Sequence, residues 1–142
     1  MGRRRGLLGV GATVVVLGAL VGGCTGPGTA APAGAVDSFL IAVSDGDGSV
    51  ACAWLAPLVA DELEQQSHEP CVAAVLEPDV ADALAGAGAA TPAGAEVFGS
   101  QAIVAVAAGT YFLAMDGDDW RITGAGCVTR PGMPADCVLA GG

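Results

Sequence analysis

The chain of 142 residues has no lysine, one histidine and one tyrosine, and aromatic residues make up only 4% of it. Without lysine it cannot use a phosphate-loop lysine, a Schiff base or a Ser-x-x-Lys nucleophile. Five arginines stand against fifteen aspartates and glutamates, a formal net charge of −10. Because phosphate binding needs clustered cations, this composition argues against a nucleic-acid partner. The length fits a single domain of ordinary size.

The few cations are concentrated at the N-terminus. Arg3, Arg4 and Arg5 precede every acidic residue, and all fifteen acids lie after residue 36. If the first 23 residues are removed, two arginines remain against fifteen acids, which gives a formal net charge of −13. A charge of that size favours solubility and repels anionic surfaces, but it does not determine a fold.

The first 24 residues are organised like an export signal. A basic segment at 1–5 precedes the fourteen-residue apolar stretch Leu7–Leu20. That stretch is shorter than the roughly 20 residues of a membrane span and fits the hydrophobic region of a signal peptide. The sequence LVGGC at 20–24 then resembles the lipobox of bacterial lipoproteins. We expect a signal peptide at 1–23 that is cleaved before Cys24. The alternatives are an ordinary secretory signal with an incidental Cys24 and a short membrane anchor.

The lipobox resemblance implies that Cys24 carries a diacylglycerol and a fatty acid such as palmitate. Each buried CH₂ group contributes about 0.8 kcal/mol, so two or three acyl chains would hold the protein on the bilayer. Residues 24–35 are expected to form a flexible tether, and residues 36–142 a single extracytoplasmic domain. We therefore expect a lipid-anchored protein on the extracytoplasmic face of the cell membrane. Its expected partners are the lipid bilayer and an unidentified envelope protein, with no nucleic acid.

The four cysteines that follow Cys24 are expected to form two disulfides. An even number of cysteines in an oxidising compartment is typical of a disulfide framework. Three connectivities are possible, and we favour Cys52–Cys71 and Cys127–Cys137 because each pair is close in sequence and lies within one half of the domain. Each bridge would stabilise the fold by roughly 2–4 kcal/mol. Zinc is the alternative, but the cysteines form no Cys-x-x-Cys pair and the histidine is remote in sequence.

The apolar pattern changes its period halfway along the domain. Apolar residues have helical spacing in four segments, 36–43, 49–63, 70–76 and 78–84. Strand patterns follow the turn-rich segment 86–94 at 95–98, 101–106, 110–115, 120–123 and 137–139. The segment 131–134 is expected to be a loop. This order predicts the α+β class, with N-terminal helices packed on a curved antiparallel sheet of about four to five strands.

Three segments resemble small secreted lipoproteins of actinobacteria. Their motifs are DGD to AC at 45–52, EPC at 69–71, and WRI through AGC to DC at 120–137. The resemblance covers most of residues 36–142 and implies the cone of nuclear-transport-factor-2-like (SnoaL-like) domains, in which helices pack on a curved antiparallel sheet. It also implies that the cysteines pair locally. Enzymes with that cone place Asp, His or Tyr in an apolar pocket, whereas the single His and single Tyr of this chain lie in separate motifs.

Few polar residues suggest a chemical site. His68 lies in the polar segment 65–69, and we interpret it as a solvated helix-end residue rather than a base or a pH sensor. Asp45 and Asp47 resemble the first ligands of a calcium loop, but the glycine and the glutamate that such a loop requires further on are missing. Helix termination and capping explain these two aspartates better.

The remaining candidates are aromatic residues and arginines. Trp54, Trp120 and Tyr111 are expected in the core, and contact with a ligand is the alternative for each. Arg121 and Arg130 are the two cations outside the leader, and we expect them to pair with surface acids.

We therefore expect no catalytic, cofactor-binding or metal-binding residues. The predicted function is a non-enzymatic, membrane-anchored lipoprotein that acts through protein or envelope contacts. A small-molecule binding module that uses the mouth of the cone is the alternative. An isomerase- or lyase-like enzyme would require a cavity that holds two acids and Tyr111.

Overall fold

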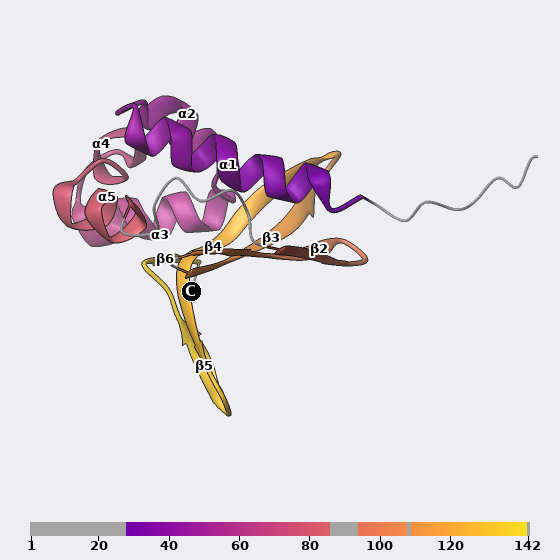
Figure 1. The fold of residues 1–142 in the computed structure, drawn as a ribbon. Coiled ribbons are helices and arrows are strands. Elements are labelled where there is room, and N and C mark those ends of the chain that lie inside the picture. The colour runs from indigo at the N-terminus through magenta and orange to yellow at the C-terminus, as the bar shows by residue number, and fades with distance from the viewer. Residues whose placement is uncertain (1–27, 86–93, 108, 142) are drawn as a thin grey trace, which may run out of the picture.

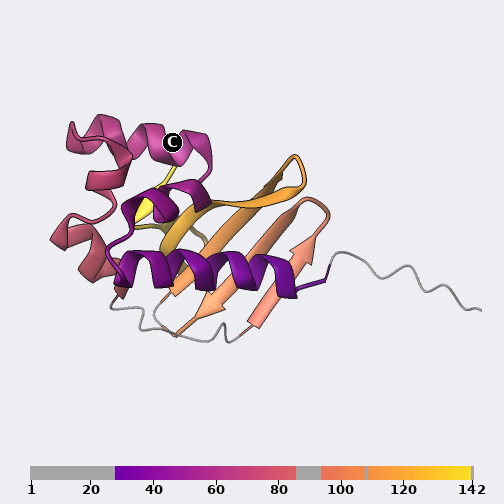
Figure 2. The ribbon, with the colours of Figure 1, turned by 90° about the horizontal axis from the view of Figure 1, so that it is seen from above.

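The computed structural model describes residues 28–85, 94–107 and 109–141. Helices form one layer of this part of the chain and a sheet forms the other (Figures 1 and 2). The expected signal peptide at 1–23 and the expected lipidation site, Cys24, lie outside the described residues. Within those residues, no helix is long and apolar enough to cross a membrane.

Five helices and six strands are found in the described residues. The helices are α1 (Ala30–Ser44), α2 (Gly48–Trp54), α3 (Pro57–Ser67), α4 (Cys71–Ala74) and α5 (Pro78–Ala85). The strands are β1 (Gly94–Phe98), β2 (Gln101–Val106), β3 (Gly109–Asp116), β4 (Asp119–Arg130), β5 (Met133–Asp136) and β6 (Leu139–Ala140). The sheet is antiparallel, in the order β1-β2-β3-β4-β5 with β6 beside β4, and it is open rather than closed. The predicted α+β class is confirmed.

Helix α1 begins six residues before the expected start of the helix at Val36. Alanine favours helix, and Pro32 falls in the first turn, where its missing N–H breaks no intrahelical hydrogen bond. Pro32, Ala35 and Val36 are buried, because α1 lies across β1, β2 and β4. The flexible tether expected for 24–35 is therefore wrong for residues 30–35, which are helical.

Capping and helix-starting residues set the ends of α2 and α3. The Asp47 carboxylate accepts a hydrogen bond from the Val50 N–H at 3.0 Å and caps α2, so its predicted capping role is confirmed. Pro57 occupies the first turn of α3, and the helix ends at His68, whose φ of 60° is left-handed.

Strand β4 is longer than expected and leaves the main sheet at its far end. Its last residues pair with β5, and we call residues 127–136 the projecting hairpin (Figure 1). The loop expected at 131–134 is wrong for Met133 and Pro134, because β5 begins at Met133, and only residues 131–132 form a turn. Gly132, with a φ of 73°, makes the turn. Pro134 is tolerated because, in the described residues, β5 pairs with β4 alone and its other edge needs no donor.

The core lies between the helices and the sheet. The rings of Phe39 from α1 and Tyr111 from β3 meet edge to face, with centroids 6.2 Å apart. Leu84 and Ile122 of the same core are also fully buried, and Trp120 is buried as well. The core positions predicted for Tyr111 and Trp120 are confirmed.

Two disulfides cross-link the domain, and both predicted pairings are confirmed. Cys52–Cys71 joins α2 to α4 with a Cα–Cα distance of 6.1 Å. Cys127–Cys137 joins β4 to the segment between β5 and β6, with a Cα–Cα distance of 3.9 Å. One bridge therefore holds the helix layer and the other holds the base of the projecting hairpin.

Candidate functional site

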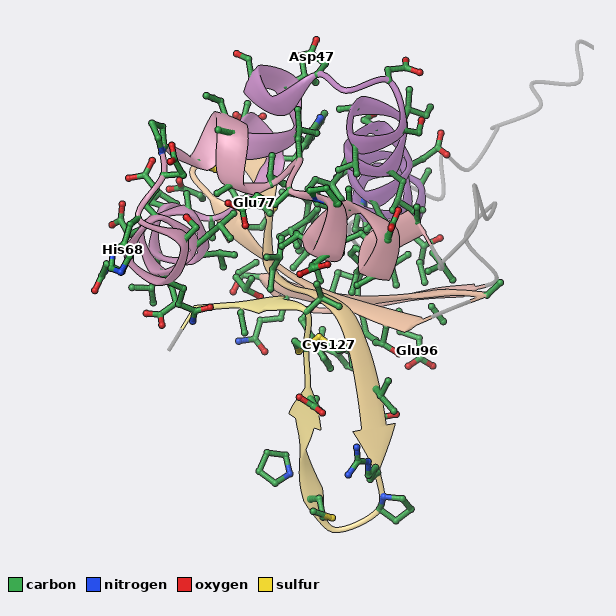
Figure 3. All side chains as sticks on the ribbon, turned by 90° about the vertical axis from the view of Figure 1, so that its left-hand side faces the viewer. Asp47, His68, Glu77, Glu96 and Cys127 are labelled. Carbon is green, nitrogen blue, oxygen red and sulfur yellow. A yellow bond between two sulfur atoms is a disulfide. The ribbon has the colours of Figure 1, made fainter. Side chains whose placement is uncertain are left out.

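The two faces of the sheet differ in what covers them. Side chains alternate between the faces along each strand. Val104, Tyr111 and Leu113 point into the helix layer and are buried, whereas Ile103 and Phe112 point the other way and are only half-buried. Among the described residues, no helix lies over this second face, which we call the outer face (Figures 1 and 3).

The outer face contains a shallow apolar hollow of about 470 Å³. Phe98, at the end of β1, is 59% exposed there. The residues that line the hollow carry no charge; they are Phe98, Gln101, Ala102, Ile103, Phe112, Leu113, Ala114 and Thr123. A concave, apolar surface without charged residues makes the hollow a candidate binding surface.

The projecting hairpin stands on the same side of the sheet as the outer face. Figure 3 shows Glu96 of β1 and Cys127 of β4 on this side, with the hairpin extending away from the helices. A Cβ added to Gly124 would lie 3.2 Å from Cys127 Sγ and 3.3 Å from the Phe112 ring. The Cys127–Cys137 disulfide and Phe112 therefore fill the corner where the hairpin meets the sheet.

The projecting hairpin combines apolar side chains with one ion pair. Met133 and Val128 are more than half exposed. Arg130 Nη2 lies 3.7 Å from Asp136 Oδ2, and both side chains are mostly exposed, so this pair contributes little to stability. A guanidinium has five N–H donors, so Arg130 can bind a further carboxylate.

Charge is distributed unevenly between the two layers. Residues 28–85, which form the helices, contain ten of the fifteen acids and no arginine. Residues 94–141, which form the sheet and the hairpin, contain the other five acids and both Arg121 and Arg130. The helix layer is therefore strongly anionic, with a formal net charge of −10, whereas the sheet and hairpin together carry a formal net charge of −3.

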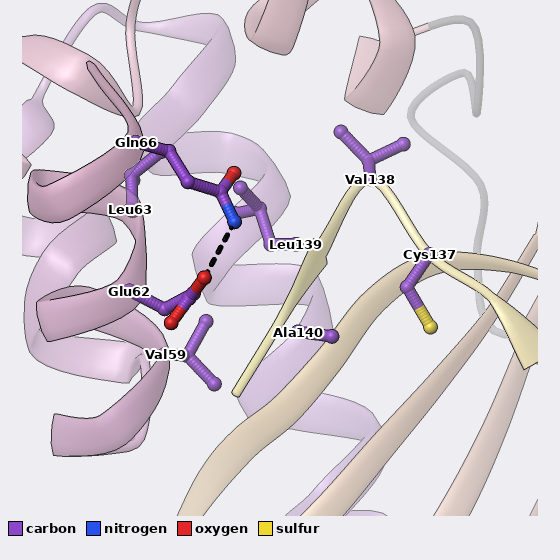
Figure 4. A pocket seen from close by; sticks show the side chains of 8 residues that line it. All are labelled: Val59, Glu62, Leu63, Gln66, Cys137, Val138, Leu139 and Ala140. Carbon is purple, nitrogen blue, oxygen red and sulfur yellow. Dashed lines mark hydrogen bonds between the residues drawn. The ribbon is translucent and has the colours of Figure 1, made fainter. Parts of the chain in front are cut away.

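A smaller cleft of about 130 Å³ lies between α3 and β6 (Figure 4). On its α3 side, Gln66 Nε2 donates a hydrogen bond to Glu62 Oε1 at 2.8 Å. Cys137 lines the opposite wall, but its sulfur is held in a disulfide. Glu62 is the only titratable side chain in the lining, so the cleft lacks the second acid or base that a general acid–base pair needs.

The Tyr111 hydroxyl is buried, and it forms no hydrogen bond within the described part of the chain. Burial raises the pKa of Tyr111 to about 12. The phenol therefore stays protonated at physiological pH, so it can donate a hydrogen bond but does not act as a base.

The predicted polar candidates do not come together into one site. His68 is exposed at the end of α3, far along the chain from Asp45 and Asp47, which are exposed in the turn between α1 and α2. Across residues 28–85, 94–107 and 109–141, no group of three or more His, Cys, Asp or Glu residues could hold a metal ion.

Both arginines of the sheet pair with surface acids, as expected. Arg121 Nη2 lies 3.6 Å from Asp119 Oδ2, and its Nη1 donates to the carbonyl oxygen of Ala53 in α2. Trp54 is half-buried and lines a shallow hollow of about 430 Å³ with Arg121 and Asp119. Because Arg121 is bonded on two sides, it ties α2 to β4 rather than presenting its charge to a ligand.

The outer face was not predicted as a site, although the sequence contains a signal for it. Residues 101–106 and 110–115 are largely apolar at successive positions, which is typical of strands that are covered on both faces. In the described residues only one face is covered, so Ile103 and Phe112 are apolar side chains without a cover. The projecting hairpin was missed because 131–134 was expected to be a loop.

No family model, no curated protein and no solved structure matches this chain. The candidate binding site is therefore assigned from the geometry of this chain alone. Of the surfaces described, the outer face with its projecting hairpin is the most distinctive.

Proposed function

We propose that this protein is a lipid-anchored, extracytoplasmic domain that acts through protein contacts rather than catalysis. The order of basic segment, apolar stretch and LVGGC motif in the first 24 residues supports the anchor at Cys24. The two disulfides of the domain support an oxidising compartment, because such bridges persist outside the cytosol.

The outer face is the surface that we assign to these contacts. The observation that carries the assignment is its uncharged hollow of about 470 Å³, with Phe98 59% exposed beside it. A contact that covers this surface removes apolar area from water, at about 25 cal/mol per Å². The hollow contains no titratable side chain, so binding suits it better than acid–base chemistry.

The resemblance to nuclear-transport-factor-2-like domains and to secreted lipoproteins of actinobacteria belongs to the same proposal. Helices packed on one face of an antiparallel sheet are consistent with it. In this chain the sheet is open, and the long hairpin departs from the simple cone.

The anchor is tested by the substitution Cys24→Ser in the full chain. Serine cannot form the thioether, so we expect loss of acylation, accumulation of the unprocessed precursor and release from the membrane fraction. Thr25→Ser, at the next position, is the matched control. Unchanged processing and membrane association in Cys24→Ser would overturn the anchor.

The contact surface is tested by placing the photo-crosslinking residue benzoylphenylalanine at Phe98 of the full chain in cell membranes. We expect a crosslinked protein product from this position. The matched control is the same residue at Val72 in α4, which is also about half exposed but belongs to the helix layer. Equal products from the two positions would refute the assignment to the outer face.

A small-molecule binding module remains a second candidate because the Tyr111 hydroxyl is a buried donor without a partner in the described residues. A ligand acceptor that reached it would satisfy this group. Native mass spectrometry of the purified protein should then show a bound compound that Tyr111→Phe loses. Identical unliganded spectra for both proteins would exclude this candidate.

A further inference from the structure

We propose that the protein that covers the outer face is a second copy of this chain, packed sheet against sheet about a two-fold axis. The inference rests on the proposed function, because it assumes that the outer face makes protein contacts. It adds the identity of the partner and the way in which the two chains fit together.

The distribution of charge favours this arrangement. The helix layer of each copy contains ten acids and no arginine, so two helix layers repel each other. The outer face has an uncharged hollow. Packing outer face on outer face places the two anionic helix layers on opposite sides of the pair, as far apart as the domain allows.

The shape of the molecule also fits a second copy. The strand order places β1 at one side of the sheet and β4, with its hairpin, toward the other. A two-fold axis parallel to the strands brings β1 of one copy over the β4 side of its partner. The projecting hairpin of each copy then extends alongside β1 of the other copy. The outer edge of β1 is unpaired in the described residues.

The length of the hairpin matches the spacing of packed sheets. Face-packed sheets lie about 10 Å apart, and a strand advances about 3.3 Å per residue. The residues from Cys127 to Arg130 therefore span about the distance between the two sheets. Arg130 would reach the level of the partner sheet.

Charges at the two borders of the outer face are complementary in this arrangement. Glu96 lies on the hairpin side of β1 (Figure 3), and Arg130 lies near the hairpin end, where it can bind a carboxylate besides Asp136. The two-fold axis pairs Glu96 of each copy with Arg130 of the other. The contact is isologous, so it closes as a dimer.

Other occupants fit less well. A basic protein would be attracted first to the helix layer, which holds most of the acids. A lipid surface offers no carboxylate at a fixed position that Arg130 could bind, whereas a second copy offers Glu96. Both remain outcomes that the experiment can return.

The test uses two versions of the full chain with different epitope tags, expressed together in cell membranes. With benzoylphenylalanine at Phe98 on one version, we expect a crosslinked product that contains both tags. With benzoylphenylalanine at Val72, the yield of the product that contains both tags should be at least about tenfold lower. This is roughly the effect of losing an important contact of an interface.

Charge reversal then tests the geometry. Glu96→Arg and Arg130→Glu should each lower the yield of the two-tag product roughly fivefold. The double variant should restore the yield, because the two exchanged charges would again attract each other across the dimer. Thermal unfolding of each variant checks that the domain still folds. A double variant that stays as weak as the single variants would overturn the proposed pairing.

The outcomes separate this inference from the proposed function. A Phe98 product that contains a different protein overturns the second copy as partner and retains protein contact at the outer face. A Phe98 product no stronger than the Val72 control overturns both. A two-tag product that is lost in Phe98→Asp but kept in Val72→Asp supports both.

Discussion

The two faces of the sheet are made by the same strands but have opposite surroundings. On the helix side, Tyr111 and Leu113 are buried, and Phe39 of α1 packs edge to face on the Tyr111 ring. On the outer side, Ile103 and Phe112 are half-buried around a hollow that no helix covers in the described residues. Similar apolar side chains thus form the core on one face and leave apolar surface on the other. The difference separates residues that hold the fold from residues that are available for binding.

The two layers also differ in charge and in cross-linking. The helix layer is anionic and is held by Cys52–Cys71, whereas the sheet holds both arginines and the bridge at the base of the hairpin. The anionic layer favours exposure to water. The uncharged, apolar hollow of the outer face favours contact with protein.

The largest expected effect contrasts phenylalanines from the two sides. Phe39→Ala should destabilise the domain by about 3–5 kcal/mol because it leaves a cavity beneath α1. Phe98→Ala should cost about 0.5 kcal/mol or less in dilute protein, because that side chain is already largely exposed. Urea unfolding of the two variants measures both values. Similar losses for the two would contradict the division between core and outer face.

The difference in free energy of unfolding between wild-type protein and Phe98→Ala also depends on protein concentration if the outer face is an interface. Binding of the folded state to a partner copy raises its apparent stability by mass action. Wild-type protein should therefore gain stability as its concentration rises, and Phe98→Ala should not. Parallel behaviour of the two proteins would speak against the dimer.

The second contrast is between the two disulfides. Removing either bridge by paired Cys→Ser substitutions should cost about 3 kcal/mol, with only a few tenths between them, because loop-closure entropy depends weakly on loop length. Amide hydrogen exchange separates their roles. Loss of Cys127–Cys137 should accelerate exchange in 127–136, and loss of Cys52–Cys71 should accelerate it in α2 and α4. The same pattern of exchange in both variants would show that the bridges do not act locally.

The order of helices and strands could be predicted from the sequence because it depends on local periodicity. The apolar spacing at 36–43 and the alternation at 120–123 each fit one element. The two disulfides could be predicted because each pair is close in sequence. The helical start at Ala30 could not, because small residues give a weak pattern and Pro32 becomes buried only when the sheet is present.

The projecting hairpin could not be predicted for a related reason. Pro131 and Pro134 flank glycine and methionine, a composition typical of a loop. Strand β5 exists because β4 continues past the sheet and offers it a partner, which is a tertiary effect. The candidate site was missed with it, since the hairpin forms one wall of the corner on the outer face.

The smallest expected effect concerns the helix side, where Tyr111→Phe should stabilise the domain by about 1 kcal/mol. The substitution keeps the ring against Phe39 and removes a buried hydroxyl that has no hydrogen-bond partner in the described residues. Thermal or urea unfolding measures the change. Destabilisation of similar size would show that the hydroxyl has a partner, such as a ligand, in solution.

The same hydroxyl makes the stability of the domain depend on alkaline pH. The pKa of Tyr111 is raised from its ordinary value of 10.0 to about 12 by burial. The resulting contribution to the free energy of unfolding is fully present below pH 10 and is lost as the pH rises through about 12, because the unfolded chain releases this proton first. Since the chain has one tyrosine, phenolate absorbance reports this residue alone. The Tyr111 phenol should ionise at higher pH in folded protein than in protein unfolded in urea, and Tyr111→Phe should lack the alkaline phase of unfolding. Ionisation at the same pH in both solvents would mean that water reaches the helix side of the sheet as readily as the outer face.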